Sequence, residues 1–301
     1  MTRPAYNQPP KFFLHAGDAQ IASFVSAEEI NLDRETVRGF GEEWKKFDSF
    51  SAEELKVAGE EYFDIVTSEM VNAETVVLDL GCGSGRWSLY IADRVACIES
   101  IDPSDSVYAA ASTLSKKKNV RVTQAGAGNI PFPDESFDFI LCLGVLHHIP
   151  DTARALHGAT QKLKPGGHAL LYFYYALENR SWIYRQIFRV VDLFRKGISK
   201  LPKALKHFCC DAIALLIYLP IVFLGKILKA ARSDYYNKLP LSYYVNKSFH
   251  VMRNDALDRF GTRLEKRFTK KRIEEMMQSA GFEHINFSGK QPYWHVTGKK
   301  I

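Results

Sequence analysis

Three glycines at alternate positions follow an apolar run in the stretch "TVVLDLGCGSGRWSLYIADRV". Gly81, Gly83 and Gly85 permit backbone conformations with positive φ, and they lack the Cβ atoms that would keep a ligand away from the main chain. The spacing is G-x-G-x-G, whereas a dinucleotide site uses G-x-G-x-x-G, with its third glycine where this sequence has Arg86. A nucleoside-like cofactor other than a dinucleotide could lie against this turn.

Two acids accompany the glycine turn. Asp79 precedes it, where a carboxylate would repel a pyrophosphate but would suit the ammonium and sulfonium charges of S-adenosylmethionine. Asp102 ends the apolar stretch "ACIESIDPS", seventeen residues beyond Gly85, where a carboxylate can accept hydrogen bonds from ribose hydroxyls. Either acid could instead be a plain turn or cap residue. The charges favour S-adenosylmethionine over the nicotinamide cofactor of a dehydrogenase.

Short apolar runs alternate with helical patterns around these residues. Residues 75–80 form a β-branched run, and residues 87–95 repeat apolar side chains at helical spacing, which predicts a strand, a tight turn and a helix. "SFDFILCLGVLHHIP" contains the next buried strand and the loop after it, and "LKPGGHALLYFYYA" contains a turn and a further strand. This alternation predicts a parallel sheet with its ligand at the carboxyl ends of the strands.

Four motifs in order and spacing carry a resemblance to a known family: "VLDLGCGSGRWS", "SIDPS", "IPFPDESFDFILCLGVLHHIPD" and "LKPGGHALLYF". They resemble class I S-adenosylmethionine-dependent methyltransferases, particularly the small-molecule branch that includes quinone-biosynthesis enzymes. The resemblance covers about residues 60–176 and resumes at "RFTKKRIEEMMQSAGFEHINFSGKQPYWHVTGKK". It implies an α/β, Rossmann-like fold: a mostly parallel seven-stranded sheet with a C-terminal antiparallel hairpin, and a helical insertion after the fifth strand.

The resemblance also implies which residues hold S-adenosylmethionine. Asp79 and the backbone of residues 81–85 would hold the methionine portion, with Leu143 near its amino group, while Asp102 would take the ribose and Pro103 would pack beside the adenine. The full set of expected cofactor-binding residues is Asp79, Gly81, Cys82, Gly83, Gly85, Asp102, Pro103, Ala127, Gly128, Asn129 and Leu143.

One stretch departs from the family pattern. Relatives commonly carry an acid pair of the type "GDAE" before "IPF", and this chain reads "AGAGN" there. Residues 127–129 are expected to line the adenine edge, so its amino group would be held by backbone or by Asn129.

Catalytic residues are less clearly marked. Methyl transfer from a sulfonium is an in-line displacement in which positioning supplies much of the catalysis, and a base is needed only if the acceptor must lose a proton. His147 and His148 in "LGVLHHIPD" are the candidates for that base, although such histidines can also be structural. The loop lacks the Asn/Asp-Pro-Pro-aromatic pattern that related methylases use on nitrogen in nucleic acids and proteins. No metal site is expected, because the five cysteines form no C-x-x-C pair or Cys/His cluster.

About ninety residues between "FYYA" and "RFTKK" exceed what the minimal fold needs, and they are the expected place for substrate recognition. Residues 180–232 hold eleven Lys and Arg against two Asp, a net charge of +9. Because the whole chain has a net charge of +6, the rest of it is about −3. Residues 181–202 repeat apolar side chains at helical spacing and predict a basic amphipathic helix.

The stretch "KHFCCDAIALLIYLPIVFLGKILK", residues 206–229, is unusually apolar. Its uncharged run, Ala212 to Gly225, is fourteen residues, short of the roughly 20 that span a bilayer, and Pro220 interrupts it. A transmembrane helix is therefore not expected. A buried lid helix and a helix lying in a membrane interface both remain open. Nucleic-acid binding is disfavoured, because a phosphate-tracking surface would not consist of aliphatic runs.

An acceptor pocket is expected to draw on both ends of the chain. In the second half of the insertion, Tyr243, Tyr244, His250 and Arg253 could form its polar wall, or they could belong to a salt-bridged loop and helix. In "VRGFGEEWKKFDSF", Trp44 or Phe47 could close over cofactor or substrate, or simply pack.

The expected organisation has four parts: residues 1–58 as N-terminal lid helices, 59–176 as the S-adenosylmethionine-binding core, 177–265 as the helical insertion and 266–301 as the last helix and closing strands. The predicted function is methyl transfer to oxygen or carbon of a small or lipid-like acceptor, in the cytoplasm at an anionic inner membrane surface. A methyltransferase of a soluble sugar or secondary metabolite is one alternative, and a non-catalytic protein that binds the cofactor and docks on a membrane is another. Nothing in the sequence indicates an oligomeric state.

Overall fold

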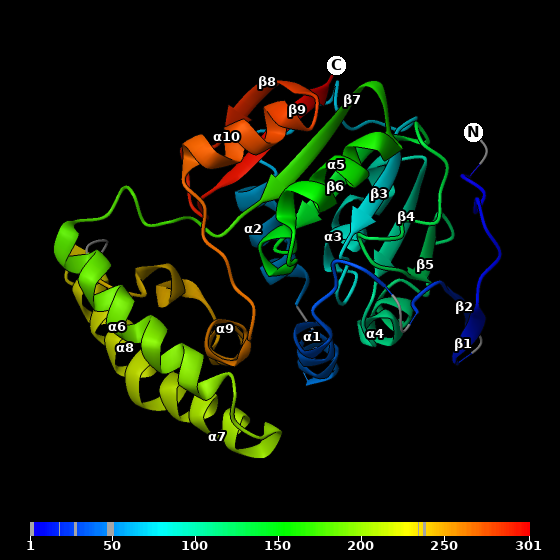
Figure 1. Cartoon of the computed structure of the whole chain (residues 1–301). Helices are drawn as coiled ribbons and strands as arrows, with labels where there is room; N and C mark the ends of the chain where they lie inside the picture. Colours follow the sequence, from blue (N-terminus) through cyan, green and yellow to red (C-terminus); the bar gives the residue numbers. More distant parts are fainter. Residues whose placement is uncertain (1–2, 18, 27–28, 47–50, 234, 237–238) are drawn as a thin grey trace. The chain divides into compact units, whose positions relative to one another are not determined.

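The computed structural model describes residues 3–17, 19–26, 29–46, 51–233, 235–236 and 239–301, with the main chain alone for 42–46. The chain forms two compact units, one of residues 1–179 with 264–301 and the other of residues 180–263. The first unit contains the sheet, and the second is helical (Figure 1).

A nine-stranded sheet runs through the first unit in the order β1-β2-β5-β4-β3-β6-β7-β9-β8. Strands β3 to β7 pair in parallel, whereas β9 is antiparallel to β7 and β8 is antiparallel to β9. The strands are β1 (Phe12–Ala16), β2 (Ala19–Ser23), β3 (Val76–Leu80), β4 (Cys97–Asp102), β5 (Val120–Gln124), β6 (Phe137–Leu143), β7 (Leu163–Tyr172), β8 (Phe282–Phe287) and β9 (His295–Lys300).

Helices cover both faces of this sheet (Figure 1). Central strands buried on both faces are predominantly apolar in sequence, and "VVLDL" in β3 and "FDFILCL" in β6 contain only one aspartate each. The helical segments of the first unit are α1 (Arg34–Lys46), α2 (Ala52–Tyr62), α3 (Arg86–Ile91), η1 (Ala92–Arg94), α4 (Ser106–Thr113), η2 (Leu146–His148), α5 (Thr152–Lys162) and α10 (Lys270–Ser279).

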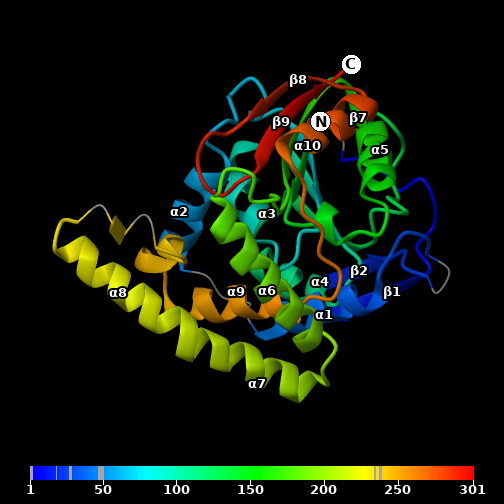
Figure 2. The same cartoon turned by 60° about the vertical axis from the view of Figure 1, so that its left-hand side comes forward.

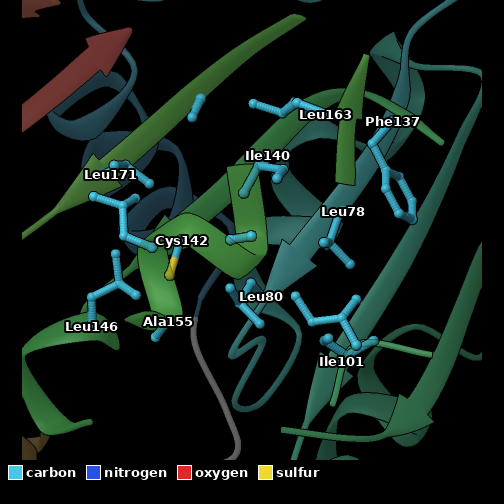
Figure 3. Close-up of a cluster of buried hydrophobic side chains, with 14 of the residues drawn as sticks. Leu78, Leu80, Ile101, Phe137, Ile140, Cys142, Leu146, Ala155, Leu163 and Leu171 are labelled. Carbon is cyan, nitrogen blue, oxygen red and sulfur yellow. The ribbon is translucent and has the colours of Figure 1, made fainter. Parts of the chain in front are cut away.

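The core forms one apolar layer on each face. Leu78 and Ile140 point to one face, where they pack with side chains of α5 and α10 such as Leu156 and Met276. Figure 3 shows part of this layer, with Leu78, Leu80 and Ile140 projecting from adjacent strands. Val77, the residue before Leu78 in β3, faces the opposite layer with α2 and α3. The alternation of side chains along each strand fixes this register.

The N-terminal region corrects two expectations. Residues 1–58 were predicted to be lid helices in front of a seven-stranded sheet, but this region also contains β1 and β2, and the sheet has nine strands. β2 pairs in parallel with β5, Ala22 opposite Thr123 and Ser23 opposite Gln124, and the Phe24 amide extends the ladder to the Gln124 carbonyl at 2.8 Å. The edge of β5 is thereby covered, which satisfies backbone groups that an open edge would expose.

The second unit consists of α6 (Trp182–Ile198), a long helix, η5 (Ser242–Asn246) and α9 (Phe249–Gly261). The long helix comprises α7 (Lys203–Ile213), the π-helical η3 (Ala214–Tyr218) and α8 (Leu219–Ala230), and Figure 2 shows it as one rod. The expectation that Pro220 would interrupt it was wrong. Proline lacks a backbone donor and clashes with the preceding turn, and the wider π-helical turn directly before it provides the room.

Because it continues through Pro220, the helix Lys203–Ala230 is 28 residues long. By length and composition it could cross a membrane, a test that the core helix of a soluble protein also meets; 28% of its most apolar window is buried. The buried positions recur every three or four residues, at Cys210, Ala214, Tyr218, Val222 and Gly225. This narrow stripe packs within the second unit against α9 and η5, as the hydrogen bond from Tyr218 to Asp255 at 2.9 Å indicates.

Candidate functional site

The glycine turn connects β3 to α3 at the carboxyl end of β3. Gly81, Gly83 and Gly85 have φ of 78°, 53° and 79°, a region that side chains with a Cβ rarely adopt. The amide of Gly81 donates to the Ile101 carbonyl at 2.8 Å, which ties the turn to β4. A Cβ at Gly81 would overlap the side chain of Val145, so close packing requires this glycine as much as a ligand would.

Asp79 lies beneath the turn and is almost fully buried. The hydroxyl of Ser88 donates to its carboxylate at 2.7 Å and also lies 2.7 Å from the Ser100 hydroxyl. Burial raises the pKa of Asp79 to about 7; the charge of Asp102 adds to this rise, while Ser88 and Arg86 oppose it. A cationic ligand beside this carboxylate would favour its ionised form, which is the electrostatic property that an ammonium-binding acid needs.

Asp102, at the end of β4, is fixed by hydrogen bonds from the protein. Its Oδ2 accepts from the Gly83 amide at 3.1 Å, and its Oδ1 accepts from the Ser104 amide at 2.9 Å and the Ser104 hydroxyl at 2.6 Å. These bonds join the acid to the glycine turn. A carboxylate has about four lone-pair positions, so it retains capacity for a ribose hydroxyl.

The loop after β5 begins beside Asp102, because the Ala125 amide donates to the Asp102 carbonyl at 3.1 Å. Ala127 and Asn129 are half-buried and Gly128 is exposed. The side-chain carbonyl of Asn129 accepts a hydrogen bond from Gln8 at 2.9 Å, so it is already engaged by the N-terminal segment. The loop therefore lies where the adenine edge was predicted, with its one amide side chain tied to Gln8.

The remaining predicted cofactor residues lie in the same region of the sheet. Leu143 ends β6 and is buried, and Pro103 directly follows β4. Cys82 is buried within the turn, and burial raises the pKa of its thiol well above the ordinary range. The carboxyl ends of β3, β4, β5 and β6 thus bring the predicted cofactor residues together, and their contact with the cofactor stays a prediction.

His147 and His148 lie in η2, directly after β6, and both are buried. His147 stacks on Tyr174 with ring centroids 3.9 Å apart, and its Nδ1 accepts from the Tyr174 amide at 3.4 Å. Burial lowers the pKa of His147 well below its usual value, with contributions from His148 and Arg267. The Nδ1 of His148 donates to the Leu264 carbonyl at 2.7 Å. Burial thus holds His147 neutral and makes its ring a weak base. A role as general base for either histidine stays a prediction.

Helix α1 bridges two of these loops. The ring of Phe40 meets that of His148 with centroids 4.8 Å apart, and a Cβ at Gly41 would lie 3.2 Å from the Asp105 amide. Trp44 lies in this helix, but its side chain is among those not described, and Phe47 lies outside the described residues. The N-terminal helix thus approaches the carboxyl ends of β4 and β6, and its role as a lid stays a prediction.

The predicted acceptor residues belong to the second unit. Arg253 forms a two-point ion pair with Asp211, at 3.0 and 2.8 Å. Tyr244 is buried and its ring contacts those of Tyr218 and Tyr243, and His250 lies half-buried in α9. These contacts are what a salt-bridged helical packing requires, and an acceptor-binding role for the four residues stays a prediction.

Sequence reasoning missed the polar residues that hold the acids in place, Ser88 and Ser104. Ser104 follows Asp102 by two residues, a spacing at which serine commonly bonds a turn acid and which could have identified it. Ser88 faces Asp79 across the first turn of α3, which no local pattern indicates. Ser84, in the turn itself, has a buried hydroxyl for which the described residues provide no partner. Among the described residues, no group of three or more His, Cys, Asp or Glu could hold a metal ion.

Comparison with known proteins agrees with this geometry. Residues 78–171 match the family model described as a methyltransferase domain. The chain is 32% identical over 138 residues to the uncharacterized methyltransferase YcgJ of Bacillus subtilis, covering 45% of this chain and 54% of that protein. It is 35% identical over 97 residues to the ubiquinone biosynthesis O-methyltransferase of Alkalilimnicola ehrlichii, covering 31% of this chain and 39% of that protein.

The fold has solved counterparts. Human N-acetylserotonin methyltransferase in complex with SAM superposes with a TM-score of 0.50 at 15% identity, over 87% of this chain and 56% of that one. At this identity the likeness concerns the fold alone.

The chain carries a methyltransferase domain of the class I, S-adenosylmethionine-dependent type. The predicted family resemblance, mostly parallel fold and cofactor are thereby confirmed. The matches cover about half the length of the first curated relative and less of the second. The family match ends at residue 171, before the second unit begins at residue 180.

Proposed function

We propose that this chain transfers the methyl group of S-adenosylmethionine to oxygen, or failing that carbon, of a small, lipid-like acceptor at an anionic membrane surface. In the reaction, the sulfur–methyl bond breaks as the acceptor's lone pair bonds the methyl carbon, and the hydroxyl proton leaves to solvent or to a base. The products are S-adenosylhomocysteine, the methylated acceptor and a proton. The ubiquinone biosynthesis O-methyltransferases among the relatives support an oxygen acceptor.

The observation that carries the cofactor half of this proposal is the buried carboxylate of Asp79 beneath the glycine turn. The cofactor supplies the transferable methyl group when bound. Asp79 favours a cationic amino-acid portion, Asp102 orients the ribose, and the turn brings backbone within reach of the ligand. Holding the acceptor in line with the methyl group then supplies most of the rate enhancement, so the reaction does not require a strong general base.

Substitution of Asp79 tests this assignment. Asp79→Asn should weaken S-adenosylhomocysteine binding about 100-fold in calorimetry, because a buried charge pair is replaced by a neutral contact. The matched control is Asp134→Asn, which breaks only an exposed ion pair with Lys162. Equal affinities for Asp79→Asn and the control would contradict the assignment.

The apolar surface of the second unit supports the proposed binding to a membrane. Helix α6 exposes large apolar side chains along one side, with Ile183 64%, Ile187 60% and Phe194 66% exposed. Among the described residues, these are some of the most exposed large apolar side chains. Exposed apolar surface of this kind is typical of a binding site for an apolar partner.

The long helix exposes a comparable apolar surface opposite its narrow buried stripe. Phe208, Leu216 and Phe223 are 70%, 71% and 62% exposed. Lys203 lies at one end of the helix, and Lys226 and Lys229 lie near the other, all exposed. Lysines that flank an apolar face can reach lipid phosphates while the face enters the interface.

Charge supports an anionic membrane as the proposed occupant of this surface. The eleven basic residues against two acids in residues 180–232 would repel a basic partner and attract anionic headgroups at about 1 kcal/mol for each basic residue near the surface. An acceptor dissolved in that membrane would explain why an apolar surface accompanies a methyltransferase domain. We therefore expect the enzyme to be cytoplasmic and to bind peripherally to the inner face of the membrane.

A further inference from the structure

The carboxylate of Glu29, a residue far from the family motifs in sequence, lies against the loop "AGAGN". A Cβ added at Gly126 would overlap Glu29 Oε1, and a Cβ at Gly128 would lie 2.6 Å from the Ile30 carbonyl oxygen. The segment around residues 29–30 therefore occupies the space that side chains at positions 126 and 128 would fill.

Hydrogen bonds fix the chain both before and after Glu29. Upstream, β2 pairs with β5, and the Ser23 hydroxyl donates to Gln124 Oε1 at 2.6 Å. Downstream, the side-chain amide of Asn31 donates to the Asp151 carbonyl at 2.8 Å and accepts from the Asp151 amide. Gln124 ends β5 and Asp151 is the N-cap of α5, so Glu29 is held beside the loop after β5.

Among the described residues, none donates a hydrogen bond to this carboxylate. Both oxygens of Glu29 are buried, and the described residues provide neither with a hydrogen-bond partner. Burial raises the pKa of Glu29, while the charges of Lys11 and Arg34 oppose the rise. A buried acceptor without a donor costs free energy until a donor arrives, which makes this carboxylate a candidate for ligand binding.

The position of this carboxylate matches the departure from the family pattern. When the alanine shared by "GDAE" and "AGAG" is aligned at Ala127, the two acid positions fall on Gly126 and Gly128. These are the same two glycines that the Glu29 segment covers. The loop lacks an acid at these positions, and the carboxylate of Glu29 from the N-terminal segment lies beside them instead.

We propose that Glu29 binds the exocyclic amino group of the adenine of S-adenosylmethionine and makes the site selective for a 6-amino purine. The inference rests on the proposed cofactor function of the same site. It replaces the expectation that Asn129 or the backbone holds this group, since the side-chain carbonyl of Asn129 is engaged by Gln8. Ala125, bonded to the Asp102 carbonyl, connects the adenine position to the ribose acid.

The chemistry gives this assignment a specific signature. A carboxylate accepts hydrogen bonds and repels a carbonyl oxygen, so it should favour a 6-amino purine over a 6-oxo purine. A glutamine can accept through its oxygen and donate through its amide nitrogen, so Glu29→Gln should tolerate both.

The test compares S-adenosylhomocysteine with S-inosylhomocysteine, its 6-oxo analogue, by calorimetry. The wild-type chain should prefer the amino ligand by at least about tenfold. Glu29→Gln should bind the oxo ligand more tightly than the wild type does, by about threefold to tenfold. A gain of binding cannot come from misfolding. An unchanged preference in Glu29→Gln would overturn the inference.

A swap of the acid provides a second test. Glu29→Ala should weaken S-adenosylhomocysteine about tenfold, and Gly126→Asp alone should also weaken it, because the new Cβ overlaps Glu29. The double variant Glu29→Ala with Gly126→Asp places an acid in the loop and removes the glutamate side chain that would overlap it. This double variant should therefore regain affinity for S-adenosylhomocysteine and preference for the amino ligand. Gly126 does not adopt a positive φ, so aspartate can take its backbone conformation.

The control and the outcomes separate this inference from the function on which it rests. Glu74→Ala removes an exposed acid of the same type and should leave both affinities unchanged. A wild-type chain that binds neither ligand would overturn the proposed function and this inference together. Binding of S-adenosylhomocysteine whose preference survives both Glu29→Ala and Glu29→Gln would overturn this inference alone.

Discussion

At the scale of single residues, Asp79 couples the site to pH. Burial raises its pKa to about 7 in the folded chain, against an ordinary value of 3.8. The folded chain therefore retains a proton that the unfolded chain releases between about pH 4 and pH 7. The free energy of unfolding should fall as the pH rises through this window, by about 4 kcal/mol in total.

Asp79→Asn should remove this dependence, because an amide does not titrate. Chemical unfolding of the cofactor-free chain at several pH values between 4.5 and 8 measures it. We expect the variant to be more stable than the wild type near pH 8 and closer to it near pH 4.5. A stability difference that is constant across this range would contradict the account of Asp79.

Polar residues of the site show which parts of it the sequence can predict. Asp79, Asp102 and the glycines were predictable because each lies within a few residues of the strand end that positions it. Glu29 was not, because its neighbourhood depends on the pairing of β2 with β5, about a hundred residues apart in sequence. Likewise, a sequence cannot reveal that the ring of His147 is buried against Tyr174 and kept neutral.

At the scale of elements, the long helix of the second unit depends on small residues in its buried stripe. A Cβ at Gly225 would lie 2.7 Å from Val245, whereas a Cβ at Gly197 in α6 would meet nothing within 4 Å. The same substitution should therefore have opposite effects at the two positions. Gly225→Ala should destabilise the second unit by about 1–3 kcal/mol through overpacking. Gly197→Ala should stabilise it by up to about 1 kcal/mol through helix propensity.

Urea unfolding followed by circular dichroism at 222 nm measures both variants under the same conditions. The comparison isolates packing, since both sites lie in helices and gain the same methyl group. Equal shifts in the same direction would show that Gly225 is not a close contact between the long helix and η5.

The elements of the sheet were predicted better than the N-terminal hairpin. β3 and β6 are apolar apart from one aspartate each because helices cover both their faces, and such runs are recognisable in the sequence. β1 and β2 are five residues each and expose most of β1, so they show little apolar periodicity. The Gly-Asp dipeptide between them was their one signal, since two-residue connections of this type favour hairpins. The long helix was mispredicted because local rules end helices near proline, and a π-helical turn was not foreseeable from sequence.

At the scale of the whole molecule, the apolar surface of the second unit should bring the chain to membranes. Leu216→Glu with Phe223→Glu should lower binding to anionic vesicles at least about tenfold, because each change places a charge where an apolar side chain would enter the interface. Co-sedimentation with vesicles of phosphatidylglycerol and phosphatidylcholine measures this effect, and raising the salt should weaken the wild type.

Val57→Glu provides the matched control, because Val57 is an exposed apolar residue on α2 of the first unit. It should leave vesicle binding unchanged. Equal binding by all three proteins would show that the second unit does not mediate docking, and wild-type protein that fails to sediment with anionic vesicles would favour a soluble sugar or secondary metabolite as acceptor.

Methylation of a lipid-like acceptor can be measured directly as transfer of labelled methyl from S-[methyl-³H]adenosylmethionine to a total lipid extract presented in anionic vesicles. After separation of organic and aqueous phases, the account predicts label in the organic phase with the wild-type chain and none above background with Asp79→Asn. Label confined to the aqueous phase would contradict a lipid-like acceptor. No transfer to lipids or to a soluble metabolite extract, by a chain that binds S-adenosylhomocysteine, would contradict catalysis itself.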